Sequence, residues 1–525
     1  MAVEYKNLTE CSRFKALQKC NMFSFEHFSE ERIRKYNVKG AEYQYNYAAK
    51  QVDDSILSLL FELAQEQQVK EKFTKLANGE TMNTGEKRMV LHHALRGQLD
   101  TAVVQDGRDY HAFYREERER CADFAEKVHS EQITGSTGKP FRTFIQIGIG
   151  GSDLGPRAIY LALKPYVDSI EGNATRRKVG FISNVDPDDA AVQLADADPE
   201  HTLFILVSKS GTTQETLTNA ALALDWLSRG GIRDPKKHMV CVTSESSPLA
   251  QSSEYLDSFF IDDYIGGRYS VSSAVGLCIL FLAFGKEVPS QFLDGMHAAD
   301  ALIYKAGVES NPALIDALIG VYERNILGYP YTAVLPYSQA LHRFPAHLQQ
   351  LDMESNGKQS NRSGAALNYS TGPVIFGEPG TNGQHSFYQL LHQGTDIVPL
   401  QFIAFAQSQI GRDIEYASST SQKKLLANLA AQIIAFTMGK ASENPHKVFK
   451  GGRPASVLYA KKLLPSVLGA LLSHFENKVM FQGFLWNINS FDQEGVQLGK
   501  VLTDTVLNNQ ASPLLRSMAD LLFEG

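Results

Sequence analysis

Short apolar runs alternate with helical stretches along most of this chain, and this alternation limits its fold more than any other feature. Five runs of strand length follow one another in the first half, at residues 144–147, 179–183, 203–207, 239–243 and 259–261. Each is separated from the next by a stretch long enough to cross back over a sheet. Parallel strands need such crossovers, so the pattern predicts an α/β fold with a parallel sheet covered by helices.

A second alternating region follows, with apolar runs at residues 331–335, 374–376, 398–405 and 479–486. We expect it to form a second parallel-rich α/β unit, joined to the first by helices between residues 277 and about 327. The first hundred residues favour helices, with apolar residues at helical spacing behind Asp53 and Asp54 as a cap. The chain is predicted to end in another helix, with Ser512 as its cap and Pro513 at its first position.

The length of 525 residues favours two or three domains over one. We place a helical N-terminal region, packing on the second domain, at residues 1–120. The first α/β domain is expected at residues 121–285. The second α/β domain, together with the C-terminal helices, is expected at residues 286–525.

Charge and cysteine usage exclude several classes of protein. The net charge of −7 gives no basic excess to bind a phosphate backbone, so nucleic acid is not expected as a partner. The cysteines are odd in number and widely spaced, which indicates neither a disulfide framework nor a zinc site. They are Cys11, Cys20, Cys121, Cys241 and Cys278. A reducing cytoplasm is the expected location.

The chain carries no sequence pattern for export or membrane insertion. Glu4, Lys6 and Glu10 stand where a secretory signal would have a basic segment and an apolar run. The longest apolar run, residues 274–284, is far shorter than the roughly 20 residues of a spanning helix. We expect it to form a buried core helix, and we expect no membrane association.

A hydroxyl-rich segment joins the run at residues 203–207 to a helical stretch that begins near residue 215. Its residues are Ser208, Lys209, Ser210, Gly211, Thr212 and Thr213. Amides at a helix N-terminus, together with these hydroxyls, form a favourable phosphate site. The alternative is an ordinary serine-rich turn that caps a helix. We favour phosphate binding because four of the six positions carry hydroxyl groups.

A glycine-rich segment, residues 148–156, also follows a predicted strand, and Pro156 is placed to open the next helix. Its glycines allow a ligand to approach the backbone closely. The spacing Gly-x-Gly-Gly-x-x-x-Gly does not match the dinucleotide pattern Gly-x-Gly-x-x-Gly. A nicotinamide cofactor is therefore not expected.

Arg268 and Glu354 are the candidate cation and base. Arg268 follows two glycines that leave its guanidinium room to reach a site, although a structural ion pair with Asp262 or Asp263 is an equal alternative. Glu354 precedes Asn356 and Gly357, which indicate a tight turn, and catalytic residues often lie on such loops. Its alternative role is that of a solvated surface carboxylate.

His385 and Lys500 complete the candidate set. His385 lies at the start of a helical stretch and has a side chain suited to proton transfer, although His392 one to two turns later is an alternative. The two histidines lack a neighbouring third ligand, so a metal site is not expected. Lys500 is by default a surface lysine.

Six ordered motifs, at residues 149–156, 208–216, 263–270, 353–358, 377–385 and 491–500, resemble those of the phosphoglucose isomerase family. The resemblance implies two sugar-isomerase (SIS) type α/β/α sandwich domains, a homodimer with sites at the subunit interface, and no cofactor or metal. It also implies interconversion of D-glucose 6-phosphate and D-fructose 6-phosphate through ring opening and a cis-enediol, in glycolysis and gluconeogenesis.

The same resemblance implies a role for each candidate residue. The substrate-binding residues would be Gly151, Ser152, Ser208, Lys209, Ser210, Gly211, Thr212, Thr213, Gln350 and Gln493. Glu354 would be the base that moves the proton between carbons 2 and 1, and Arg268 would stabilise the enediol. His385, supplied by the partner subunit, and Lys500 would open the sugar ring.

Two other functions stay open at this point. One is a sugar-phosphate-binding regulator of the same fold that lacks catalysis, and the other is an isomerase that also accepts mannose 6-phosphate. The chain departs from many family members at Leu351, at residues 359–360, and at Ser210 and Gly211, which reduce the bulk beside the phosphate. None of these departures removes a candidate catalytic group.

Overall fold

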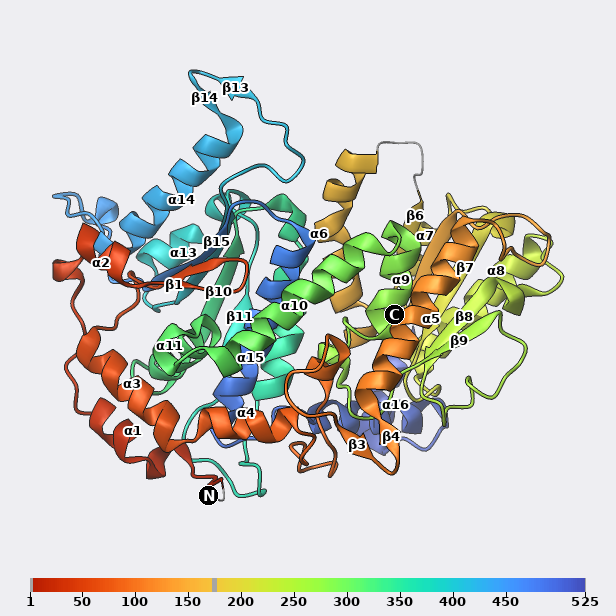
Figure 1. The fold of residues 1–525 in the computed structure, drawn as a ribbon, viewed down its shortest axis with the longest axis horizontal. Coiled ribbons are helices and arrows are strands. Elements are labelled where there is room, and N and C mark those ends of the chain that lie inside the picture. The colour runs from red at the N-terminus through yellow and green to blue at the C-terminus, as the bar shows by residue number, and fades with distance from the viewer. Residues whose placement is uncertain (1–2, 172–176, 525) are drawn as a thin grey trace.

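The computed structural model describes residues 3–171 and 177–524, and the chain forms two large sheets, each covered by helices (Figure 1). The helix α6 (Leu154–Glu171) stands between the two halves of the molecule. The predicted fold class, α/β with two parallel-rich sheets and helical extensions at both ends, is confirmed. The boundaries placed at residues 120 and 285 stay a prediction.

The first sheet contains five parallel strands in the order β6-β5-β7-β8-β9. Their bounds are β5 (Thr143–Ile147), β6 (Lys178–Ile182), β7 (Thr202–Val207), β8 (Met239–Thr243) and β9 (Asp257–Phe260). Each lies within two residues of a predicted run. All side chains of β5, β7 and β8 are buried, because helices cover both faces of the sheet.

Helices cover the two faces of the first sheet. On one face lie α5 (Tyr110–His129), α6 and α9 (Ala274–Phe284); on the other lie α7 (Pro187–Leu194) and α8 (Gln214–Arg229). Every residue of α9 is buried, as predicted. Residues 267–284, which include α9, are apolar enough to span a membrane, but 94% of the segment is buried inside the protein. It is a core helix.

The second sheet has the order β1-β2-β15-β12-β10-β11. Its parallel strands are β10 (Tyr331–Pro336), β11 (Val374–Phe376), β12 (Leu400–Phe405) and β15 (Ala455–Ala460). The N-terminal region adds the antiparallel pair β1 (Asn37–Lys39) and β2 (Gln44–Asn46), and β2 pairs with β15. The sequence predicted helices alone in this region, so both of these strands were missed.

The predicted strand at residues 479–486 is wrong. These residues lie at the end of α15 (Pro465–Leu485), whose side chains are almost all buried. A helix that is covered on all sides has no polar face, so its apolar run cannot be told from that of a buried strand. The fourth parallel strand is β15, which lies before this helix.

The remaining helices complete the second half and the two ends of the chain. They are α1 (Ser12–Leu17), α2 (Glu30–Lys35), α3 (Asp54–Glu66), α4 (Val69–Ala77), α10 (Glu287–Lys305), α11 (Pro312–Asn325), α12 (Phe344–Gln349), α13 (Tyr388–Gln393), α14 (Ser421–Met438), α16 (Gln497–Leu507) and α17 (Pro513–Glu524). The predicted caps are present: Asp53 accepts from the amide of Ile56, and Ser512 accepts from that of Leu515.

Candidate active site

The hydroxyl-rich loop lies where it was predicted, between the end of β7 and the first residue of α8. Gly211 has a φ of +68°, a backbone conformation that suits glycine, and its amide donates to Ser208 Oγ over 3.2 Å. The amide of Thr212 donates to Ser210 Oγ over 3.2 Å. The Thr213 side chain forms no capping bond to α8. The loop and the helix N-terminus together form a potential anion site.

The glycine-rich loop after β5 packs backbone against backbone on the loop that carries Arg268. A Cβ atom added to Gly151 would lie 2.1 Å from the carbonyl oxygen of Gly267, so only glycine allows this approach. A Cβ atom at Gly150 would lie 3.3 Å from Gln350 Nε2. Residues from the first sheet and from the segment after α12 therefore meet at this point. The helix after the loop begins at Leu154, two residues before the predicted Pro156.

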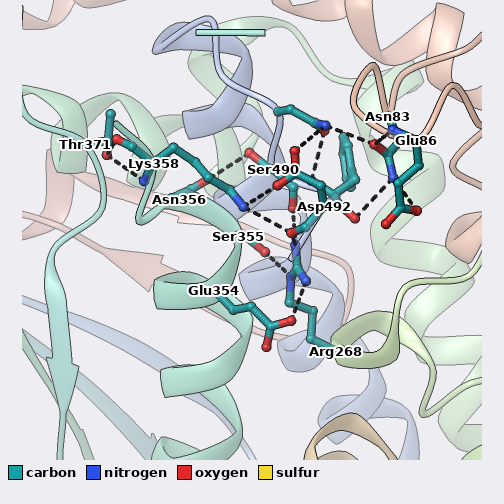
Figure 2. Close-up of polar contacts among 12 residues, drawn as sticks. Asn83, Glu86, Arg268, Glu354, Ser355, Asn356, Lys358, Thr371, Ser490 and Asp492 are labelled. Carbon is teal, nitrogen blue, oxygen red and sulfur yellow. Dashed lines mark hydrogen bonds and ion pairs between the residues drawn. The ribbon is translucent and has the colours of Figure 1, made fainter. Parts of the chain in front are cut away.

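Arg268 is held on every side and is only 1% exposed. Its Nε donates to Ser355 Oγ over 2.6 Å, and its Nη2 donates to the carbonyl oxygens of Ser490 and Asp492 over 2.6 and 3.0 Å. Its Nη1 lies 2.9 Å from Glu354 Oε1 (Figure 2). The alternative pairing with Asp262 or Asp263 is wrong.

Glu354 is the last residue of a π-helical turn, residues 350–354, that continues α12. Its Oε1 accepts from Arg268, and its Oε2 accepts from Gln350 Nε2 over 2.9 Å. The side chain remains 21% exposed. Glu354 therefore lies on a helical turn, not on the loop predicted from Asn356 and Gly357, and π-turns are frequent at functional sites.

A third segment, residues 489–492, contacts Arg268 and the residues that follow Glu354 (Figure 2). Lys358 Nζ lies 2.5 Å from Asp492 Oδ1 and 3.0 Å from the Asp492 carbonyl oxygen. Asn489 Nδ2 donates to the other carboxylate oxygen of Asp492 over 2.7 Å. Ser490 Oγ donates to Asn356 Oδ1 over 2.7 Å.

The ion pair of Lys358 and Asp492 was not predicted from the sequence. Lys358 and Asp492 both lie inside the motifs that carry the family resemblance, at residues 353–358 and 491–500. Their opposite charges could have indicated an ion pair. The two residues are more than a hundred positions apart, however, and no local sequence pattern predicts such a pairing.

Three predicted residues lie apart from this cluster. His385 ends a short 3-10 turn, residues 382–385, and is exposed. Lys500 lies on α16 and Gln493 just before it, and both are exposed. Within the described residues, none of the three forms a hydrogen bond with Glu354 or Arg268. Gln493 directly follows Asp492, whose carbonyl oxygen accepts a hydrogen bond from Arg268.

A second carboxyl of the π-helical turn is buried. Asp352 is two residues before Glu354, and its Oδ1 atom is buried without a hydrogen-bond partner in the described chain. Burial away from water raises the pKa of Asp352 to about 7, although the charge of Lys478 opposes this shift. The two carboxyl groups of one turn thus occupy different environments.

Known proteins resemble this chain over nearly its whole length. A family profile described as phosphoglucose isomerase matches residues 46–519. The glucose-6-phosphate isomerase of Treponema denticola is 56% identical, covering 99% of this chain and 100% of that protein. That of Borreliella afzelii is 45% identical, covering 97% and 96%. A crystal structure of a glucose-6-phosphate isomerase from Chlamydia trachomatis has a TM-score of 0.92 at 41% identity, covering 98% of this chain and 99% of that one.

Proposed function

The chain belongs to the phosphoglucose isomerase family, and we propose that the Glu354 and Arg268 pair carries its chemistry. The protein is a glycolytic enzyme that interconverts D-glucose 6-phosphate and D-fructose 6-phosphate. The observation that most directly supports the assignment is the 2.9 Å contact between Glu354 Oε1 and the buried guanidinium, with the carboxylate still partly exposed.

The phosphate of the substrate binds in the loop between β7 and α8. Helix amides and hydroxyl groups converge there, and Lys209 adds a positive charge. The proposed ligands are Ser152, Ser208, Lys209, Ser210, Gly211, Thr212 and Thr213, with Gly151 and Gln350 beside the sugar and Gln493 at the phosphate end. The close packing at Gly151 and the contact of Gln350 with Glu354 support this arrangement.

Ring opening comes first, because the proton on carbon 2 becomes acidic only when carbon 1 is a carbonyl. We assign this step to His385 and Lys500, one group protonating the ring oxygen while the other removes the proton of the carbon 1 hydroxyl. The family resemblance carries this assignment. Both side chains are exposed in the single chain, so a second subunit can contact them.

Proton transfer between carbons follows. Glu354 removes the proton from carbon 2 and returns it to carbon 1, passing through a cis-enediol. Negative charge develops on the sugar oxygens in between, and Arg268 stabilises it. A guanidinium has five N–H donors. Four of those of Arg268 donate to protein oxygens of the described residues, and we assign the remaining Nη1 N–H to the substrate oxygens.

Exchange of the carbon 2 proton with deuterated solvent, measured alongside isomerisation, tests the role of Glu354. Wild type is expected to do both, and Glu354→Gln to do neither. Asp352→Asn is the matched control, since it changes a buried carboxyl of the same turn that lines a different cavity, without Glu354 or Arg268. It is expected to keep both activities at pH 7. Full activity of Glu354→Gln would contradict the assignment of Glu354 as the base. A wild type that binds sugar phosphate without isomerising it would instead be a non-catalytic sugar-phosphate-binding regulator.

We further propose a homodimer in which His385 completes the site of the partner subunit, and a cytoplasmic location in keeping with five free cysteines. Mixing two inactive variants, His385→Ala and Glu354→Gln, tests the shared site. Random exchange of subunits would then restore roughly a quarter of wild-type activity, because half of the sites in each mixed dimer receive both intact groups. Two variants that stay inactive after verified subunit exchange would contradict it.

A further inference from the structure

The second sheet repeats the strand arrangement of the first. The order β11-β10-β12-β15 matches β6-β5-β7-β8, and all neighbours within both sets are parallel. A 3-10 turn follows the first strand of each set, at residues 150–152 and 339–341, and leads into α6 or α12. In both sheets the strand order reverses at the central pair, β5 and β7 or β10 and β12. Ligands of open α/β sheets bind at the carboxyl ends of strands where the order reverses.

In the first sheet this position holds the glycine-rich and hydroxyl-rich loops of the active site. In the second sheet it holds a groove of about 450 Å³, within the size range of small-molecule sites. One wall is formed by residues 337–340 after β10, another by residues 405–410 after β12, and a third by α6. Figure 1 shows α6 between the two sheets.

The groove is lined by amides and hydroxyls above an apolar base. The polar side chains are those of Tyr337, Ser338, Gln339, His342, Gln407, Ser408, Gln409 and Gln422, together with Lys164. Phe405 and Leu463 form buried parts of the base. Among the described residues that line the groove there is no carboxylate, and its lysine, Lys164, is paired with Asp168.

Some of these polar groups are fixed and others are free. The Gln409 amide nitrogen donates to the Ala162 carbonyl over 2.8 Å, and that of Gln422 donates to the Phe405 carbonyl over 2.6 Å. The side chains of Ser338, Gln407 and Ser408 form no hydrogen bond within the described parts of the chain. Two anchored amides and several free donors and acceptors match the hydroxyl groups of a polyol.

We infer that this groove is a second small-molecule site, for a polyhydroxylated ligand of about the size of a hexose. It holds no counterpart of the Glu354 and Arg268 pair, so it binds its ligand without isomerising it. It is separate from the catalytic site, because residues 337–342 lie before the N-terminal end of α12 whereas Glu354 lies beyond its C-terminal end.

Sorbitol is the probe for this site, since it has the hydroxyl groups of a hexose but no carbonyl or phosphate. Saturation-transfer NMR and calorimetric titration are carried out on the wild-type protein with saturating fructose 6-phosphate, which occupies the catalytic site. The double variant Gln407→Leu, Ser408→Val removes two free polar groups of the groove. Gln105→Leu, an exposed glutamine on a separate hairpin, is the control.

We expect sorbitol to bind in the presence of fructose 6-phosphate. The dissociation constant is expected to rise by at least about tenfold in the double variant, because two hydrogen bonds are lost, and to stay unchanged in the control. Isomerase activity and melting temperature should match wild type in both variants. The inference is overturned if sorbitol does not bind, if fructose 6-phosphate displaces it, or if a folded, active double variant binds it as well as wild type.

Discussion

Replacing Gly151 by alanine should impair catalysis by pushing apart the glycine-rich loop and the loop that carries Arg268. The added Cβ would lie 2.1 Å from the Gly267 carbonyl oxygen and 2.2 Å from its carbon, whereas such contacts are essentially never closer than 3.0 Å. Both neighbours are backbone atoms, so no side chain can rotate away. The loops must therefore separate by about 1 Å, and Arg268, the next residue along, moves with its loop.

A displacement of this size at a catalytic group lowers the rate by about a hundredfold. We therefore expect kcat/KM to fall by about 10²-fold, which corresponds to about 3 kcal/mol of transition-state stabilisation. The added methyl should also cost about 1–3 kcal/mol of folding stability through overpacking. Steady-state kinetics and urea unfolding measure the two effects separately.

Gly266→Ala is the matched control, because it adds a methyl group to the same arginine-bearing loop. Its Cβ would lie 3.6 Å from the Tyr269 ring, an ordinary contact. This variant should keep wild-type stability and most of its activity. A Gly151→Ala protein with wild-type kcat/KM and an unchanged unfolding midpoint would refute the reasoning, since the loops would then tolerate the methyl without moving Arg268.

Two further substitutions test the environment of the site. Because the folded-state pKa of Asp352 is raised to about 7 from 3.8, the wild type should lose folding stability as pH rises from about 4 through 7, by up to a few kcal/mol. Asp352→Asn should lack this loss, so between pH 5 and pH 8 the free energy of unfolding of the variant should increase relative to that of the wild type. A difference that stays constant between the two pH values would contradict the raised pKa. Lys358→Met removes the partner of Asp492, whose backbone helps to hold Arg268, and should cost about 1–3 kcal/mol and lower kcat. Lys75→Met is the control at a more exposed ion pair, and it should change the free energy of unfolding by less than about 1 kcal/mol in the same urea assay. If Lys75→Met and Lys358→Met lost equal stability, the pairing of Lys358 with Asp492 would contribute no more than a surface ion pair.

Local patterns were sufficient to predict the first sheet and its loops. Each of its strands contains a short apolar run, and the two loops begin directly after β5 and β7. The burial of Ala274–Phe284 followed from its composition and length. These features depend on residues close in sequence, so periodicity and turn chemistry reveal them.

Features that depend on distant partners were missed or misassigned. The pairing of β2 with β15 joins residues about four hundred positions apart, and β2 is too short to show alternation. The end of α15 was predicted as a strand because a helix buried on all sides gives the same apolar run. Likewise, local sequence gave an ion pair with Asp262 or Asp263 as an equal alternative for Arg268, whereas its partner is Glu354, from the other half of the chain.

Three separate segments of the chain position Arg268, the residue that we propose stabilises the enediol. Its own loop comes from the first sheet, Glu354 and Ser355 come from the turn after α12, and the carbonyls of Ser490 and Asp492 come from the segment after α15. The two carbonyls and the Ser355 hydroxyl fix the plane of the guanidinium, and in this orientation its Nη1 atom faces the Glu354 carboxylate. A cation oriented before the substrate binds needs little reorganisation when charge develops on the enediol, which is the condition for effective electrostatic catalysis. A change that loosens any one of the three segments should therefore act on kcat even where it leaves Glu354 itself intact.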